Sequence, residues 1–146
     1  NSIFKRSFSN FSRSRYDRRN FLYRYKGSAE SLHVSMTIFK KIIDKEIPTD
    51  ILYEDDFCIA FNDINPQAPI HILIIPKKEI PQLSLSDEND SELLGKLLIA
   101  ANKIAEDHYT KDAFRIVINN GAKAGQSVFH LHLHLLAGRP LSWPPG

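Results

Sequence analysis

The chain has 146 residues, which suits one domain with one hydrophobic core, and its 42% hydrophobic and 25% charged residues are ordinary for a globular protein. No apolar run approaches the roughly 18 residues that a membrane-spanning helix needs, so we expect no membrane partner. Cys58 is the only cysteine, which excludes an intrachain disulfide and fits a reducing compartment.

The net charge of +2 combines a basic arm with an acidic body. Residues 1–28 hold eight of the 19 Lys and Arg residues but only one of the 17 Asp and Glu residues. The body has no basic field, so a nucleic-acid partner is not expected. We therefore predict a basic N-terminal extension over residues 1–36, disordered or used for targeting, and a folded domain over residues 37–146.

The composition of the arm bears on where the protein resides. An arm rich in Arg, Ser and aromatic residues is typical of an organelle transit peptide, although an inert tail and a nucleic-acid-binding arm are alternatives. We expect an intracellular protein. Its location is the cytoplasm, or the mitochondrion or another organelle if the arm is a transit peptide.

The folded domain begins with a short helix and a hairpin. Thr37–Lys45 has apolar residues spaced one turn apart, which predicts a short helix capped by Thr37. Ile51–Glu54 and Phe57–Asp63 are strand-like runs separated by two acids, and this pattern indicates a tight hairpin. Cys58 lies in the second run and is expected to be a packed small residue rather than a reactive thiol.

The next segments alternate between strand and helix. Ile70–Pro76 is an apolar run that predicts a central strand; His71 interrupts it and, considered alone, would be a hydrogen-bonded core residue. Ser86–Tyr109 has the apolar spacing of a long helix, with Ser86 as its cap. Phe114–Asn119 predicts another strand. The loop after it holds two glycines, whose backbone N–H groups could approach an anion closely.

Three histidines alternate with leucines near the end of the domain, over His130–Leu136. In an extended strand successive side chains point to opposite faces, so the histidines share one face and the leucines the other. The leucine face can pack against the core, which leaves the histidine face to line a surface or a cleft. A polar face that is merely rich in histidine is the alternative without chemistry.

Two kinds of chemistry suit this face. In a zinc site, His130 and His132 could approach one ion with His71 as an outside ligand, but the three strand histidines could not share it, because residues four apart on a strand are separated by roughly 13 Å. The second possibility is nucleophilic attack on phosphorus by the middle imidazole. The flanking imidazoles then donate hydrogen bonds to phosphoryl oxygens or transfer a proton to the leaving group. Backbone N–H groups of residues 125–127 stabilise the negative charge. The second scheme uses every conspicuous residue nearby. We therefore predict no metal and no cofactor.

The sequence His130-Leu131-His132-Leu133-His134-Leu135-Leu136 resembles the signature of the histidine triad (HIT) family. The segments KIIDKEIP, AFNDINPQAPIHILIIPKK, GQSVFHLHLHLLAGR and WPPG resemble the Hint branch, the purine nucleoside phosphoramidases. The resemblance covers about Thr37 to Gly146. It implies an α+β fold, a five-stranded antiparallel sheet with one short and one long helix, and a homodimer whose sheets are continuous. The pattern of apolar residues gives the same five strands and two helices.

The resemblance also implies an activity. Relatives of this branch hydrolyse the P–N bond of adenosine or guanosine 5′-phosphoramidates through a covalent nucleotidyl-histidine, so the expected partners are AMP, GMP and their phosphoramidates. Two other hypotheses stay open at this point. The chain could be a nucleotide-binding regulatory or scaffold protein, or a zinc-binding protein.

Site residues follow from the same resemblance. His132 resembles the nucleophile, His130 and His134 its flanking partners, and His71 a fourth histidine of the site. Asp63 resembles the carboxylate that accepts hydrogen bonds from both ribose hydroxyls. The resemblance also implies contacts to the phosphate, the leaving group and an apolar purine slot from Ser127, Ile64, Asn119, Gly125, Gln126, Ile38, Phe39, Ile42, Ile47, Phe61, Leu73 and Trp143.

Two residues depart from the family pattern. Asn120 stands where many relatives carry an acid on the leaving-group side, and Ala137 stands where Hint proteins often have glycine. Neither change removes a reacting group, but Asn120 could shift the preference for a leaving group.

Overall fold

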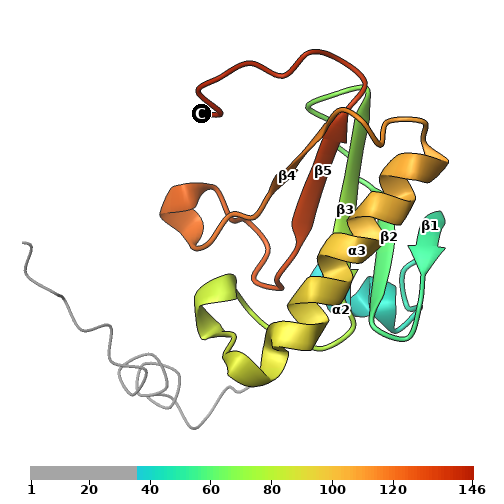
Figure 1. Cartoon of the computed structure of the whole chain (residues 1–146). Helices are drawn as coiled ribbons and strands as arrows, with labels where there is room; N and C mark the ends of the chain where they lie inside the picture. The colour runs from blue at the N-terminus through green and yellow to red at the C-terminus, as the bar shows by residue number, and fades with distance from the viewer. Residues whose placement is uncertain (1–35) are drawn as a thin grey trace, which may run out of the picture. The chain divides into compact units, whose positions relative to one another are not determined.

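The computed structural model describes residues 36–146, and the predicted basic extension therefore lies outside the described residues except for its last residue, Met36. The described part is built from a five-stranded sheet, one short and one long α-helix, and three 3₁₀ turns (Figure 1). The regular elements are α2 (Ile38–Ile43), β1 (Ile51–Glu54), β2 (Cys58–Asn62), β3 (Ile70–Pro76), η1 (Leu83–Leu85), η2 (Glu88–Asp90), α3 (Ser91–Asp107), β4 (Phe114–Val117), η3 (Ala122–Ala124) and β5 (Leu133–Ala137).

The strands lie in the order β1-β2-β3-β5-β4, and every neighbouring pair is antiparallel. The predicted α+β class, with five strands and two helices, is confirmed. β5 lies between β3 and β4, so the histidine strand is an inner strand of the sheet. Its register places His134 opposite Leu73 of β3 and Leu136 opposite His71.

The two faces of the sheet bury two separate apolar clusters. One face packs against α3 and buries side chains that include Cys58, Leu133 and Leu135. The other face packs against α2 and buries Phe39 among its residues. Strand alternation therefore places Leu133 and Leu135 on the α3 face, in the core as predicted, and leaves His134 on the α2 face. Figure 1 shows α3 lying across its face of the sheet, with α2 behind.

Thr37 and Cys58 take the roles that the sequence predicts. The hydroxyl of Thr37 accepts a hydrogen bond from the backbone N–H of Lys40 at 3.1 Å, which caps α2. Cys58 is completely buried, and burial raises the pKa of its thiol to about 12. The thiol is therefore a protonated core group at neutral pH and not a nucleophile.

The long helix begins later than Ser86, which corrects the predicted start. The hydroxyl of Ser86 donates to the carbonyl of Leu83 and so closes the turn η1. Asp87 is the N-cap of the next turn, η2. Its carboxylate accepts from Asn89 N–H, while the carboxylate of Asp90 accepts from Asp87 N–H. Asp90 also forms an ion pair with Lys78, in which Nζ lies 2.6 Å from Oδ1. This reciprocal capping forms η2 before α3 begins at Ser91.

β5 begins at Leu133 rather than at His130, which corrects the predicted strand. In the β3–β5 register, the residue opposite Leu131 would be Pro76, which has no N–H to donate to the ladder. The N–H of Leu131 instead donates to the carbonyl of Ile80 at 2.6 Å. His130 and His132 therefore lie in the segment before the strand, outside its ladder.

Within residues 36–146, none of the helices has both the length and the apolar character needed to cross a membrane.

Candidate active site

His132 is held by the backbone of its own motif. Its Nδ1 lies 2.7 Å from the carbonyl oxygen of His130. A carbonyl only accepts hydrogen bonds, so Nδ1 carries the proton and Nε2 keeps a lone pair. His132 is 5% exposed, and burial lowers its pKa against the opposing effects of the His130 carbonyl and Asp63. The ring is therefore neutral at physiological pH, with one free basic nitrogen.

His130 is buried more deeply and is also anchored to backbone. Its Nε2 donates to the carbonyl of Pro76 at 2.7 Å, and the residue is 2% exposed. The N–H of Leu131, which would face Pro76 in the register, donates to Ile80 instead, so the carbonyl of Pro76 is available to this ring. Burial lowers the pKa of His130. The side chain of His130 ties the approach segment to the end of β3, while its carbonyl orients His132.

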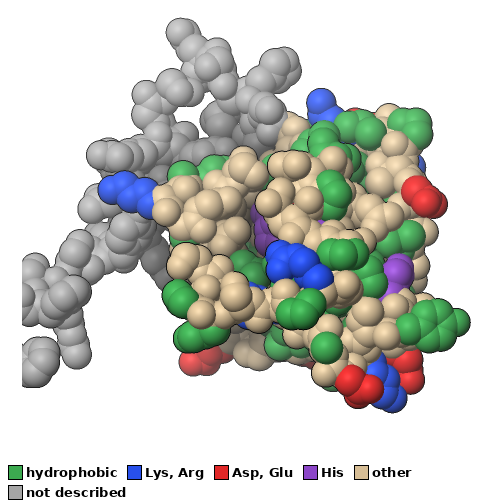
Figure 2. All heavy atoms as spheres, turned by 90° about the horizontal axis from the view of Figure 1, so that it is seen from above, with side chains coloured by type: hydrophobic (Ala, Val, Ile, Leu, Met, Phe, Trp, Pro, Cys, Tyr) green, Lys and Arg blue, Asp and Glu red, His purple; other side chains and the backbone are tan. Residues whose placement is uncertain are grey.

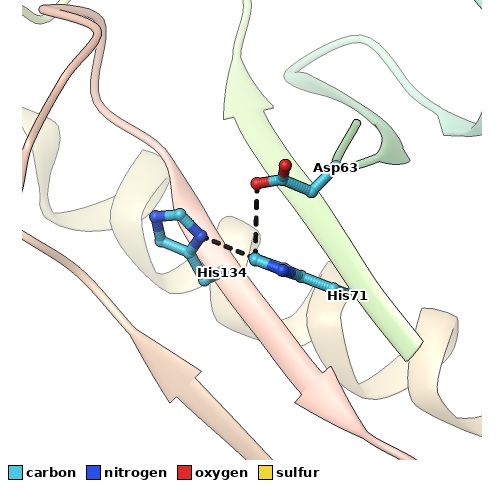
Figure 3. Close-up of side chains that lie close together, drawn as sticks. All are labelled: Asp63, His71 and His134. Carbon is cyan, nitrogen blue, oxygen red and sulfur yellow. Dashed lines mark hydrogen bonds and ion pairs between the residues drawn. The ribbon is translucent and has the colours of Figure 1, made fainter. Parts of the chain in front are cut away.

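His134 and His71 meet diagonally across β5 and β3. Because His71 faces Leu136, it is the diagonal neighbour of His134, close enough for their rings to touch. His71 Nε2 lies 2.9 Å from His134 Nδ1 and 3.4 Å from Asp63 Oδ2 (Figure 3). His71 is therefore not an isolated core histidine but contacts His134 and Asp63, and its role in the reaction stays a prediction.

Burial keeps both of these rings neutral. Burial lowers the pKa of His134 to about 4, helped by His132 and His71 and opposed by Asp63. Burial also lowers the pKa of His71, and Asp63 again opposes it. Only small areas of histidine are visible on the face seen in Figure 2, among apolar side chains and backbone.

An apolar cluster lies directly against the nucleophile candidate. Phe39 of α2 contacts the His132 ring edge-to-face, with centroids 5.0 Å apart, and contacts Phe61 of β2 in the same way at 5.7 Å. Five of the six residues predicted for the purine slot belong to this cluster: Phe39, Ile42, Ile47, Phe61 and Leu73. The sixth, Ile38, is 49% exposed and is not in the cluster.

The glycine loop before the histidines is organised around Gln126. This side chain is 4% exposed, and both of its polar atoms form hydrogen bonds. Its Oε1 accepts from Gly121 N–H at 2.8 Å, and its Nε2 donates to the carbonyls of Pro81 and Val128 at 2.8 and 3.0 Å. The amide thus positions the loop, and its predicted direct contact to phosphate stays a prediction.

The other loop residues remain near this clamp. Gly125 has φ 96° and lies close to the side chain of Asn119, which a Cβ on Gly125 would approach to 3.6 Å. Ser127 is exposed beside Gln126, where solvent and ligands can reach its hydroxyl. Asn120 accepts a hydrogen bond from Ser84 N–H through Oδ1 at 2.8 Å. A carboxylate could accept the same bond, so the departure at Asn120 leaves this loop contact intact.

Three predicted or departing residues lie outside these contacts. Ile64 is 98% exposed and Trp143 is 82% exposed, so neither is buried against the histidines, and their substrate contacts stay predictions. Ala137 is completely buried on the α3 face, where its methyl group is accommodated.

One contributor to the site could not be found from sequence patterns. The backbone N–H of Gln67 donates to His71 Nδ1 at 3.0 Å. A backbone donor leaves no signature in the side-chain sequence. The only available signal was the loop of residues 65–69, whose two prolines exclude regular structure and free its N–H groups for other partners.

Comparisons with known proteins agree with this geometry. The HIT domain model matches residues 44–141. The chain is 63% identical over 110 residues to an uncharacterised HIT-like protein of Synechocystis, covering 75% of this chain and 96% of that one. It is 52% identical over 114 residues to a 14 kDa zinc-binding protein of Zea mays, covering 77% and 89% of the two chains.

A solved structure of a similar protein has the same fold. The crystal structure of a HIT family hydrolase from Legionella pneumophila superposes with a TM-score of 0.74 at 46% identity, covering 76% of this chain and 100% of that one. The antiparallel sheet, the two helices and the histidine motif are therefore those of the HIT fold, and this chain belongs to the HIT domain family.

Proposed function

We propose that this protein is a purine nucleoside phosphoramidase, which hydrolyses the P–N bond of adenosine or guanosine 5′-phosphoramidates. The observation that carries the proposal is the hydrogen bond from His132 Nδ1 to the His130 carbonyl, which leaves Nε2 as an unprotonated nucleophile in a neutral ring. The family and the hydrolase from Legionella pneumophila support hydrolytic chemistry in general. The preference for a P–N bond rests on the resemblance to the Hint branch.

The reaction takes place in two displacements at phosphorus. In the first, His132 Nε2 forms a bond to phosphorus while the P–N bond breaks, and the departing amine takes up one proton from solvent through the exposed Ser127 hydroxyl. In the second, water forms a P–O bond and releases one proton to solvent as the bond to His132 breaks. The products are an amine and a nucleoside monophosphate, and His132 returns to its starting state.

The surrounding groups bind the nucleotide without a permanent positive charge. His134 and the backbone N–H groups of the glycine loop can donate to phosphoryl oxygens. Asp63 accepts one bond from Asn65 N–H at 2.8 Å and lies 3.4 Å from His71, and a carboxylate has room for two further ribose hydroxyls. The cluster of Phe39 and Phe61 offers an apolar surface for the base.

The test is release of AMP from an adenosine 5′-phosphoramidate by the wild type and His132→Asn, each with and without a chelator. We expect turnover by the wild type alone, unchanged by the chelator, and AMP binding by both proteins. Turnover by His132→Asn would contradict the histidine mechanism. AMP binding without turnover by the wild type would instead indicate a nucleotide-binding regulatory protein.

Zinc binding is a second candidate function, because one group of described residues has suitable geometry. Ligand atoms of Asp63, His71 and His134 all lie within 4.8 Å of one another. The nitrogens of His71 and His134 are 2.9 Å apart, close to the roughly 3.3 Å expected for two nitrogens on one zinc ion. Binding of zinc through His71 Nε2 would require the proton to leave this nitrogen, while Nδ1 already accepts a hydrogen bond from Gln67 N–H. A zinc site and the hydrogen bond between His71 and His134 are therefore alternative states of these two rings.

The relative in Zea mays, a zinc-binding protein, adds support for this candidate. The test is elemental analysis of protein purified without added metal, in the wild type and in Asp63→Asn. Near-stoichiometric zinc in the wild type that falls in the variant would support a zinc site at these residues. Negligible zinc in the wild type would remove the candidate.

A further inference from the structure

We propose that His71 fixes the proton of His134 on Nε2, so that His134 acts as a neutral hydrogen-bond donor and not as a general acid. His71 is then a positioning residue that acts through His134. The proton arrangement itself is a property of the folded protein; only its catalytic consequence rests on the proposed phosphoramidase function.

The argument starts at the loop between β2 and β3. Gln67 N–H donates to His71 Nδ1 at 3.0 Å. A nitrogen that accepts a hydrogen bond has no proton of its own, so Nδ1 of His71 carries the lone pair. The remaining proton of this neutral ring must therefore be on Nε2. Protonating Nδ1 would point two N–H groups at each other.

Two further hydrogen bonds fix the position of Gln67, whose backbone N–H is this donor. The carbonyl of Gln67 accepts from Arg139 Nη2 at 2.9 Å, and its side-chain amide donates to the carbonyl of Asn65 at 3.0 Å. The neighbouring residues Pro66 and Pro69 further restrict the backbone. The N–H of Gln67 is thus a fixed donor, which sets the direction of every hydrogen bond that follows.

The next hydrogen bond passes this direction to His134. His71 Nε2 carries a proton and lies 2.9 Å from His134 Nδ1, so His71 donates and His134 accepts. Nδ1 of His134 is then unprotonated, and the proton of this neutral ring is on Nε2. Figure 3 shows that the second nitrogen of His134 lies on the side of the ring away from His71. Among the described residues no hydrogen-bond partner meets this nitrogen, so it can donate to a ligand.

The charged and titratable neighbours of His134 are consistent with a neutral ring. A cation has a proton on both nitrogens, whereas Nδ1 of His71 accepts from Gln67 N–H and Nδ1 of His134 accepts from His71. Asp63 Oδ2 is 3.4 Å from His71 Nε2, on the side of the proton that His71 donates. A proton on His71 Nε2 therefore satisfies His134 and Asp63 together, whereas the reverse tautomer would leave a lone pair of His71 facing the carboxylate.

The catalytic consequence is specific. A neutral Nε2–H of His134 can donate to a phosphoryl oxygen through both displacements without changing its protonation state. It cannot supply the proton that the leaving amine needs, because that would require either an imidazolium ion or an imidazolate product. The proton must come from solvent or a hydroxyl instead. This divides the two flanking tasks between His134 and the Ser127 side of the site.

The experiment is long-range ¹H–¹⁵N NMR of the histidine rings at pH 7 in the full chain, which distinguishes the two neutral tautomers and the cation directly. We expect wild-type His134 to be the neutral Nε2–H form and His71 likewise. A wild-type spectrum with His134 as the Nδ1–H form or as the cation would overturn the proposal, whatever the activity of the protein.

A matched pair of variants tests the role of His71. His71→Gln places an amide N–H near the position of imidazole Nε2, and His71→Glu places an acceptor of the same size there. Both lose the ring that accepts from Gln67, so any effect on that loop is shared. We expect His134 to keep the Nε2–H tautomer in His71→Gln, and to become the Nδ1–H form or the cation in His71→Glu.

Kinetics of the same pair separate this inference from the proposed function. We expect kcat for the phosphoramidate to be at least tenfold lower in His71→Glu than in His71→Gln. Equal kcat values with different tautomers would show that the tautomer has no catalytic role and would overturn the consequence. If the wild type has His134 as the Nε2–H tautomer but lacks phosphoramidase activity, only the proposed function is contradicted. If the wild type is active but has His134 as the Nδ1–H tautomer, only the inference is contradicted.

Discussion

The amide of Gln126 donates to the carbonyl of Pro81 at 2.8 Å and so joins two loops that are 45 residues apart in the sequence. One loop follows β3, and the other delivers the chain to the histidines. The same side chain accepts from Gly121 N–H and donates to Val128. The backbone groups that the proposed mechanism uses for charge stabilisation are thus held by a buried side chain.

Replacing Gln126 with Met should lower both stability and turnover. The two side chains are similar in size, but Met would leave one N–H and two carbonyl groups without a partner in a buried region. We expect a loss of about 2–3 kcal/mol in the free energy of unfolding, measured by urea denaturation, and a lower kcat from the displaced loop. Lys123→Ala, an exposed change in the same loop, should alter stability by less than about 0.5 kcal/mol. Equal effects of the two changes would contradict the role assigned to Gln126.

A second prediction concerns the two adjacent residues at the start of α2. Phe39 is 7% exposed and contacts the ring of His132, whereas Ile38 is 49% exposed. We expect Phe39→Leu to cost about 1–2 kcal/mol of unfolding free energy and to raise KM for the purine substrate. Ile38→Ala should leave stability within about 0.5 kcal/mol. A larger rise in KM for Ile38→Ala than for Phe39→Leu would show that the purine contacts the outer face of α2.

The outcome at His71 shows which parts of the site a sequence can predict. Alternation alone predicted that Leu133 and Leu135 share a buried face and that His134 points to the opposite face, because a shift of one residue would exchange the two sets. The resemblance assigned His71 to the site, and the diagonal register with His134 gives the physical reason. The N–H of Gln67 could not be predicted, since it belongs to the backbone of an irregular loop.

The boundaries that the sequence placed wrongly have local causes of the same kind. Alternation extends through His130, but the strand begins at Leu133 because Pro76 of the partner strand lacks an N–H. Helical periodicity extends toward Ser86, but the carboxylates of Asp87 and Asp90 form a capped turn first. In both places the pattern of apolar residues was correct, and local hydrogen bonding decided where the element starts.

A third prediction concerns residues 1–28. We propose that this basic segment directs the protein to an organelle, on the evidence of its composition. Fusing residues 1–28 to a fluorescent reporter should give an organellar pattern, and a fusion with the arginines replaced by glutamine should be diffuse. A diffuse signal from the unaltered segment would contradict targeting. It would favour an inert tail or a binding arm instead.

The last prediction follows from the neutral state of His134. Its pKa is about 4 in the folded protein, against roughly 6.5 for an unfolded histidine. The unfolded chain therefore binds more protons between these values, so stability is fully present above about pH 6.5 and is lost as the pH falls toward 4. The buried rings of His71, His130 and His132 act in the same direction.

Removing the imidazole should remove its share of this pH dependence. Between pH 7 and pH 5, we expect wild-type unfolding free energy to fall by about 1–2 kcal/mol more than that of His134→Asn. Urea denaturation followed by circular dichroism at the two pH values measures both slopes. The comparison is made within each protein, so any constant loss of stability in the variant cancels. Parallel slopes would mean that His134 is not held neutral by the fold, because a ring with an ordinary pKa contributes nothing to the difference.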